Sequence, residues 1–123
     1  MTKYFKYSEF DSPLQQGSGQ LMDDGFLYML DNARHIADVP FTITSGFRIE
    51  ADIERLEKEG YKVSKNSSHL KGLAADIACT DSITRYIIID ALLKAGFTRI
   101  GIAKTFIHVD NDLDKAQNCI WTY

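Results

Sequence analysis

Two histidines and one aspartate stand at positions where they could bind one metal ion together. His69 and Asp76 lie seven residues apart in the segment SSHLKGLAAD, and His108 follows much later in FIHVD. Catalytic zinc is typically held by three His or carboxylate ligands, and its fourth position is left to water. Each residue alone could be an ordinary polar side chain. The pattern S-x-H-x-x-G-x-A-x-D followed by H-x-D makes a zinc site the better hypothesis, although this ligand set can also hold other divalent ions.

The residues around Asp76 have the pattern of a strand. LAADIAC, residues 73–79, alternates so that Asp76 points away from the apolar row of that strand. Gly72 permits the bend by which the chain carrying His69 can fold back toward the Asp76 carboxylate. Ser67 can hydrogen-bond locally and fix the histidine loop, a kind of support that metal ligands usually have.

Two strands near the end of the sequence would carry His108. Residues 98–103 (TRIGIA) and 105–110 (TFIHVD) are close enough in sequence to form a hairpin. In the second strand a period of two puts His108 and Asp110 on the same face. If this strand lies beside the strand of Asp76, the three candidate ligands meet on one side of a sheet.

The remaining elements are predicted from the periodicity of apolar residues and from the residues that cap or end helices. Apolar residues recur at helical steps over residues 21–37, and residues 49–59 have an apolar side and a charged side, with Gly60 as the C-terminal cap. Between these helices, residues 41–45 (FTITS) alternate as a strand does. A third helix should begin after Asp81 or Ser82 and end at Gly96. Its predicted core stripe consists of Ile83, Tyr86, Ile87 and Ala91.

This order of elements predicts an α+β fold. A small, mainly antiparallel sheet would have helices packed on one face, and the opposite face would be left for the zinc site. With 123 residues, the chain is expected to form a single domain over residues 1–123.

Composition narrows the classes of partner. Hydrophobic residues make up 45% and charged residues 25%, and the formal net charge is −3, so a general nucleic-acid-binding role has little electrostatic support. We see neither a signal peptide nor a membrane span and expect a protein made in the cytoplasm. Cys79 and Cys119 lack metal-site spacing and are expected to be reduced thiols, mostly interior.

Three blocks resemble the motifs of the zinc D-Ala-D-Ala carboxypeptidase family, which includes phage endolysins that cut L-Ala-D-Glu bonds. These blocks are SGFR (residues 45–48), SSHLKGLAAD (residues 67–76) and FIHVD (residues 106–110). The resemblance covers roughly residues 41–121, and the compact form here is similar to phage-encoded versions that act on the host cell wall. It implies a Hedgehog/DD-peptidase-like fold and a zinc peptidase that hydrolyses peptidoglycan stem peptides or their precursors.

The same resemblance implies roles for single residues. His69, Asp76 and His108 match the zinc ligands, and Arg48 matches the arginine that binds or polarises the substrate. Ser67 matches the serine of the metal loop, and Ser45, which opens the SGFR block, would support the site or contact the substrate.

One departure from the family pattern leaves the catalytic acid open. Many members have Glu or Asp three residues before the last histidine ligand, where this chain has Thr105. Asp110 is the candidate for the proton-transferring acid, and the alternative is that Asp110 only orients a ligand or caps the following turn. A zinc-bound, non-catalytic wall-binding module and a virion structural component also remain as alternatives. The sequence does not separate a D,D-carboxypeptidase from an L-Ala-D-Glu endopeptidase, and it leaves the oligomeric state open.

Overall fold

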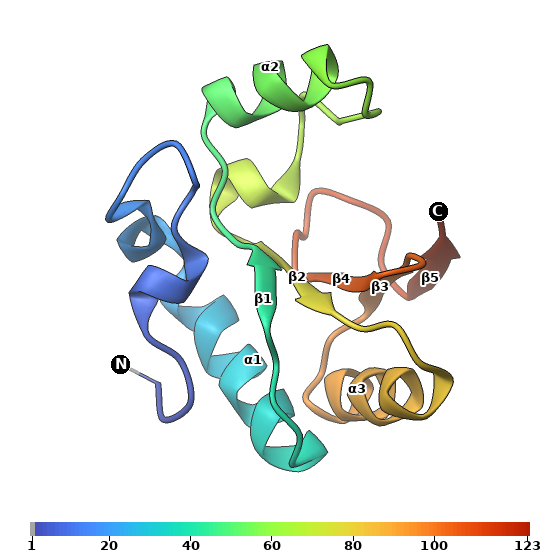
Figure 1. The fold of residues 1–123 in the computed structure, drawn as a ribbon. Helices are drawn as coiled ribbons and strands as arrows, with labels where there is room; N and C mark the ends of the chain where they lie inside the picture. The colour runs from blue at the N-terminus through green and yellow to red at the C-terminus, as the bar shows by residue number, and fades with distance from the viewer. Residues whose placement is uncertain (1) are drawn as a thin grey trace.

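The computed structural model describes residues 2–123. It consists of one β-sheet with helices on both of its faces (Figure 1). The three α-helices are α1 (Asp24–Ala37), α2 (Glu50–Lys58) and α3 (Ser82–Lys94). Short 3-10 helices are η1 (Tyr7–Phe10), η2 (Ser18–Leu21) and η3 (Ser68–Lys71). The strands are β1 (Ile43–Ser45), β2 (Ala74–Ala78), β3 (Arg99–Ile102), β4 (Phe106–Asp110) and β5 (Cys119–Thr122).

The five strands form one mainly antiparallel sheet in the order β1-β2-β4-β3-β5. β3 and β4 form the predicted antiparallel hairpin, and β4 also pairs antiparallel with β2. β5, which the sequence analysis did not predict, adds to the edge as a parallel partner of β3. The α+β class and the mainly antiparallel sheet are therefore confirmed.

Alternation along the strands separates a core face from a polar face. Ile77, Ile107, Val109 and Ile100 are fully buried on the face that α1 and α3 cover, and they belong to the hydrophobic core. Asp76 and the other even-numbered residues of β2 and β4 lie on the opposite face. The helices α1 and α3 thus cover one face, as predicted, whereas α2 stands on the other side of the sheet, where the polar residues gather (Figure 1).

The helix starts follow from local caps. Asp23 caps α1 by accepting a hydrogen bond from the amide of Phe26 at 2.9 Å, so α1 begins three residues later than predicted. Asp81 caps α3 in the same way, through the amide of Thr84 at 2.9 Å, as one of the two predicted caps. Gly60 follows α2 with a φ of 91°, which fits its predicted role at the end of that helix.

The predicted core stripe of α3 is wrong in part. Ile83 and Tyr86 are 77% and 75% exposed, and the helix instead buries Ile88, Ala91 and Leu92. Apolar residues occur all around this helix, so its sequence alone does not select the buried side.

Two smaller observations complete the fold. Cys79 is buried as expected, whereas Cys119 at the start of β5 is only half-buried. Within residues 2–123, none of the helices has the length and apolar character needed to cross a membrane.

Candidate metal centre

The pairing of β2 with β4 places Asp76 directly opposite His108. The two residues are Cα partners in the antiparallel register, and Nδ1 of His108 lies 2.9 Å from Oδ1 of Asp76. Both side chains are on the polar face of the sheet and are buried. The sequence prediction that two neighbouring strands carry these candidate ligands is confirmed.

The loop before β2 brings His69 to the same point. Ser67 caps η3, and its Oγ accepts a hydrogen bond from the amide of His69 at 3.2 Å. Gly72 ends η3 with a φ of 71°, a left-handed conformation that favours glycine and turns the chain into β2. As a result, Nε2 of His69 lies 3.4 Å from Oδ1 of Asp76.

A backbone carbonyl fixes the orientation of the His69 ring. Nδ1 of His69 lies 2.8 Å from the carbonyl oxygen of Gly46, and the amide of Arg48 donates back to the carbonyl of His69 at 3.2 Å. Because a carbonyl only accepts, Nδ1 must carry the proton, and Nε2 keeps its lone pair toward Asp76. This is the arrangement of a neutral imidazole ready to bind a cation.

A carboxylate fixes the orientation of the His108 ring. Nε2 of His108 donates to Oδ2 of Asp110 at 2.7 Å, so Nδ1 faces Asp76. Oδ1 of Asp110 accepts from Nε of Arg99 at 2.6 Å and from the amide of Asp112 at 3.2 Å. Asp110 is 1% exposed, and both of its oxygens are occupied by these contacts.

The donor atoms of this cluster fit a small divalent cation. His69, Asp76 and His108 are all buried, and each offers a ligand atom within 4.8 Å of the others. Zinc bonds of about 2.0–2.2 Å at tetrahedral angles require donor atoms roughly 3.3 Å apart. The 3.4 Å separation from Oδ1 of Asp76 to Nε2 of His69 is close to this value, whereas the 2.9 Å separation from the same oxygen to Nδ1 of His108 is shorter.

The electrostatics of the cluster favour a bound cation. Burial alone raises the pKa of Asp76, but hydrogen bonds from His108 and His69 outweigh it and hold the pKa well below its usual range. Burial lowers the pKa of His69, so this ring is neutral at neutral pH. Burial alone also lowers the pKa of His108, but hydrogen bonds to Asp110 and Asp76 outweigh it and raise the pKa. Because the pKa of His108 is raised, a proton competes with a metal ion for Nδ1 of this ring.

Arg48 approaches the cluster from the segment between β1 and α2. Its Nη2 lies 3.3 Å from Oδ2 of Asp76, and its Nε donates to Oγ of Ser45 at 3.0 Å. A guanidinium group has five N–H donors, so donors remain for a substrate oxygen after these two contacts. The SGFR block thus brings both Arg48 and Ser45 to the metal centre.

Thr105 lies outside this constellation. It stands in the bend before β4, is exposed, and does not line the cleft around the metal centre. The acidic residues that line this cleft are Asp52, Asp76 and Asp110. Thr105 therefore offers no carboxylate and does not reach the cleft.

An aromatic wall beside His108 comes from β5, which the sequence analysis missed. Trp121 is the register partner of Gly101, and its ring centroid lies 5.6 Å from that of His108. A Cβ atom on Gly101 would lie 2.7 Å from Nε1 of Trp121, so only glycine lets the indole lie this close. The guanidinium of Arg99 lies 4.9 Å from the Trp121 ring centroid. Alternation in β3 predicts that Arg99 and Gly101 share a face. The position of Trp121 depends on the pairing of β5 with β3, which the sequence pattern does not indicate.

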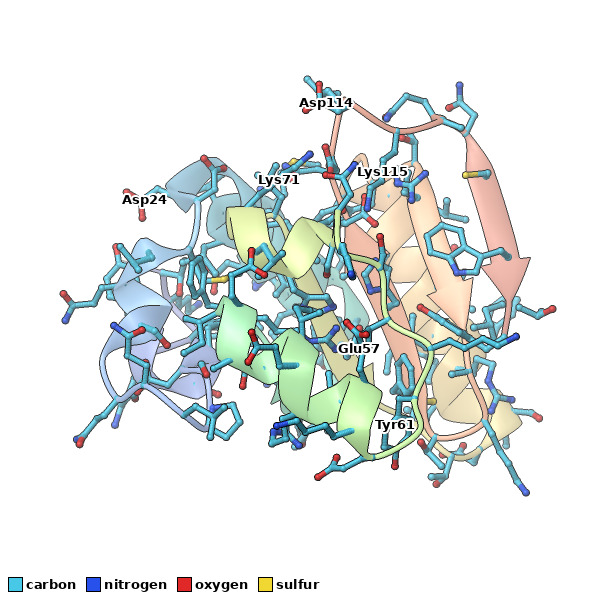
Figure 2. All side chains as sticks on the ribbon, turned by 90° about the horizontal axis from the view of Figure 1, so that it is seen from above. Asp24, Glu57, Tyr61, Lys71, Asp114 and Lys115 are labelled. Atoms are coloured by element: carbon cyan, nitrogen blue, oxygen red, sulfur yellow. The ribbon has the colours of Figure 1, made fainter. Side chains whose placement is uncertain are left out.

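The metal centre opens into a cleft of about 690 Å³. Residues of α2 and the loop after it form one flank, and β5 contributes Trp121 to the other. Seen from above, this loop, marked by Tyr61, and the loop between β4 and β5, marked by Lys115, stand at opposite ends of this face (Figure 2).

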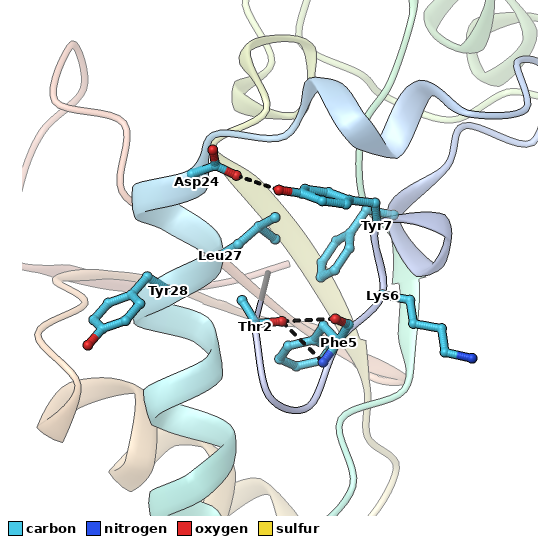
Figure 3. Close-up of a pocket in the computed structure, with 8 residues that line it drawn as sticks. Thr2, Phe5, Lys6, Tyr7, Asp24, Leu27 and Tyr28 are labelled. Carbon is cyan, nitrogen blue, oxygen red and sulfur yellow. Dashed lines mark hydrogen bonds between the residues drawn. The ribbon is translucent and has the colours of Figure 1, made fainter.

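A second hollow is lined by none of these residues. It has about 220 Å³ and is formed by the N-terminal segment and α1, where the hydroxyl of Tyr7 donates to Asp24 at 2.9 Å (Figure 3). Its lining has no histidine and a single carboxylate, so it does not offer a comparable ligand set.

Two imidazoles and one carboxylate converge where they line a cleft, with an arginine beside them, and this ligand set could hold a catalytic metal ion. The sequence matches the peptidase M15 family over residues 3–110, and the chain belongs to that family. The solved structure of the L-Ala D-Glu endopeptidase ChiX from Serratia marcescens has a similar fold, with a TM-score of 0.64 and 18% sequence identity. The match covers 77% of this chain and 84% of ChiX. No curated protein sequence matches the chain significantly.

Proposed function

We propose that this chain is a zinc-dependent peptidase that hydrolyses the peptides of peptidoglycan. The observation that carries the proposal is the convergence of His69, Asp76 and His108 at the floor of the cleft in a member of the peptidase M15 family. The similarity of fold to an L-Ala D-Glu endopeptidase supports peptidoglycan as the substrate class.

The three ligands would be Nε2 of His69, a carboxylate oxygen of Asp76 and Nδ1 of His108. Gly46 and Asp110 hold the other nitrogen of each ring, so neither imidazole needs to rotate before it binds the ion. Bound zinc supplies an activated water at neutral pH and polarises a carbonyl group.

Arg48 would hold the substrate against this centre. Its guanidinium is already aligned by Ser45 and Asp76, so its remaining donors are directed without a further cost in side-chain entropy. We propose that these donors bind the oxygen of the scissile carbonyl or a carboxylate of the peptide.

We propose that Asp110 acts through His108 and does not transfer the proton itself. Both of its oxygens are already bonded, one to His108 and one to Arg99 and the amide of Asp112. A general base needs an oxygen within hydrogen-bond reach of the attacking water. The contacts of Asp110 support the second of the two roles considered from the sequence, the orientation of a metal ligand.

One observation favours a second candidate, a zinc-bound module that binds the cell wall without cutting it. Thr105 replaces the usual acid, and both oxygens of Asp110 are already hydrogen-bonded, so neither residue is available to transfer a proton. In this case the cleft would still bind a stem peptide.

Digestion of peptidoglycan separates the two candidates. Zinc-loaded protein would be incubated with purified peptidoglycan and with defined stem peptides, and the products would be identified by mass spectrometry. Release of D-Ala would indicate a carboxypeptidase, and a new N-terminal D-Glu would indicate an endopeptidase. The His108→Ala variant should give neither product. Bound peptide without cleavage by the zinc-loaded intact protein would support the binding module instead.

A further inference from the structure

A lysine from the loop between β4 and β5 reaches the cleft close to the metal centre. Lys115 lines the cleft, its side chain is 24% exposed, and its Nζ donates to Oγ of Ser68 at 3.0 Å. Ser68 is the immediate neighbour of His69 in η3. Lys115 therefore brings a positive charge to the residue that directly precedes His69, a candidate metal ligand.

The hydrogen bonds around Ser68 fix the position of this ammonium group. Oγ of Ser68 donates to Oδ2 of Asp112 at 2.8 Å and accepts from Lys115, so the hydroxyl is used in both directions. Asp112 is 1% exposed. The ammonium of Lys115 is thus anchored, through Ser68, to a buried carboxylate.

Asp112 pairs with both lysines, but it binds Lys71 more closely than Lys115. Lys71 binds both carboxylate oxygens of Asp112, at 3.1 and 3.0 Å, whereas Nζ of Lys115 lies 3.9 Å from the nearer oxygen. Lys71 does not line the cleft. An ammonium has three N–H donors, and within residues 2–123 only the bond to Ser68 uses one of those on Lys115.

The cleft as a whole has a positive balance that contrasts with the chain. The protein has a formal net charge of −3, yet the cleft lining has three acidic residues and five basic ones: Arg48, Arg55, Lys62, Arg99 and Lys115. Arg99 is paired with Asp110, and Arg55 binds Glu59. A bound divalent ion would add to this positive balance, so an anionic group is the favoured ligand for Lys115.

We propose that Lys115 is a specificity-determining residue that binds a free carboxylate of the substrate peptide at its end of the cleft. The inference rests on the proposed function and names the group that the cleft recognises. Stem peptides offer two such groups near their scissile bonds, the α-carboxylate of D-Glu and the C-terminal carboxylate.

Matched peptides distinguish the two sources. The parent peptide L-Ala–γ-D-Glu–L-Lys–D-Ala–D-Ala would be compared with one form amidated at the D-Glu α-carboxylate and another amidated at the C-terminus. Binding to zinc-loaded protein would be measured by titration calorimetry, and kcat and KM would be measured from product release. For intact protein we expect amidation at the recognised carboxylate to weaken binding and raise KM by about 10-fold to 100-fold.

Replacement of the lysine should remove this discrimination. We expect Lys115→Met to bind the parent peptide as weakly as the amidated one, with kcat changed less than KM. Lys115→Arg keeps the charge and should keep most of the preference. Lys104→Met is the matched control, because it removes an exposed ammonium that does not line the cleft, and it should keep the full preference.

The outcomes separate this inference from the proposed function. If Lys115→Met retains the preference of the intact protein for carboxylate over carboxamide at both positions, the inference is wrong. Binding with discrimination but without cleavage would contradict the peptidase proposal and leave the role of Lys115 supported. If the intact protein binds none of the three peptides, both proposals fail.

Discussion

Nε2 of His108 lies 2.7 Å from Oδ2 of Asp110, and this contact determines which ring nitrogen faces the metal centre. Nδ1 is left 2.9 Å from Oδ1 of Asp76, where a carboxylate oxygen and a nitrogen lone pair would repel each other without a proton or a cation between them. The geometry of His108 is therefore that of a metal ligand supported by a carboxylate.

Zinc should stabilise the folded protein, because the three ligands converge only in the native state. At a free zinc concentration 100 times the dissociation constant, the expected gain is about 2.7 kcal/mol. Thermal unfolding with zinc and with a chelator measures this difference. His69→Ala and His108→Ala should lose the zinc-dependent shift. His35→Ala, which removes an exposed histidine of α1, should keep it, and a shift retained by both ligand variants would contradict the assignment.

Asp110→Asn should weaken zinc binding by about 10-fold to 100-fold, because the variant removes the carboxylate that orients His108. The measurement is a competition with a chromophoric chelator, together with kcat for cleavage of a stem peptide. Asp90→Asn, at an exposed ion pair with Lys94, serves as the control and should change neither quantity. An Asp110→Asn protein with normal zinc affinity and no turnover would instead assign proton transfer to Asp110.

Gly101→Ala should destabilise the fold by about 1–3 kcal/mol, the usual cost of overpacking. The added methyl group would meet the indole of Trp121 at 2.7 Å, and the ring must move away from His108 to relieve the contact. Urea unfolding gives the change in free energy, and Trp121, the only tryptophan in the chain, reports the movement through its fluorescence. Unchanged stability and an unchanged emission spectrum would show that this close approach does not exist in solution.

The cluster around Asp112 predicts a loss of stability in acid. Burial alone raises the pKa of Asp112, but hydrogen bonds from Lys71 and Ser68 outweigh it and lower the pKa. A carboxyl group whose pKa is lower in the folded state stabilises the protein above the unfolded pKa, roughly 4, and this contribution is lost as the pH falls through the folded pKa.

Below about pH 4, the free energy of unfolding should therefore fall more steeply for the intact protein than for Asp112→Asn. Urea unfolding at a series of pH values measures both slopes. Lys71→Met removes the main partner of Asp112 and should give an intermediate slope, so it provides a second test if the first variant folds poorly. Equal slopes for all three proteins would contradict the assigned role of Asp112.

The sequence was sufficient for the elements that carry the metal centre. The two-residue alternation of β2 and β4 correctly placed Asp76 and His108 on the polar face, and the hairpin of β3 and β4 is present as predicted. The caps of the helices were also readable, because Asp81 and Gly60 act through local backbone contacts. These signals depend on neighbours in sequence.

What could not be predicted depends on tertiary contacts. β5 is a four-residue edge strand whose residues are only half-buried or exposed, so its hydrophobic pattern is a weak signal in the sequence. The strand forms through its pairing with β3, which is a tertiary contact. The buried side of α3 is chosen by α1 and the sheet, and the Lys115–Ser68 contact joins segments 47 residues apart. The expected phage origin and site of synthesis stay predictions, since no contact in the fold depends on them.

The two imidazoles differ in how easily a substitution nearby can change their basicity. The ring of His69 is held by the main-chain oxygen of Gly46, an acceptor that every amino acid supplies, so substitution there alters position but not basicity. The ring of His108 is held by a side-chain carboxylate that is itself paired with Arg99. Libraries that aim to exchange the preferred metal, or to shift the pH range of activity, should therefore vary Asp110 and Arg99 first.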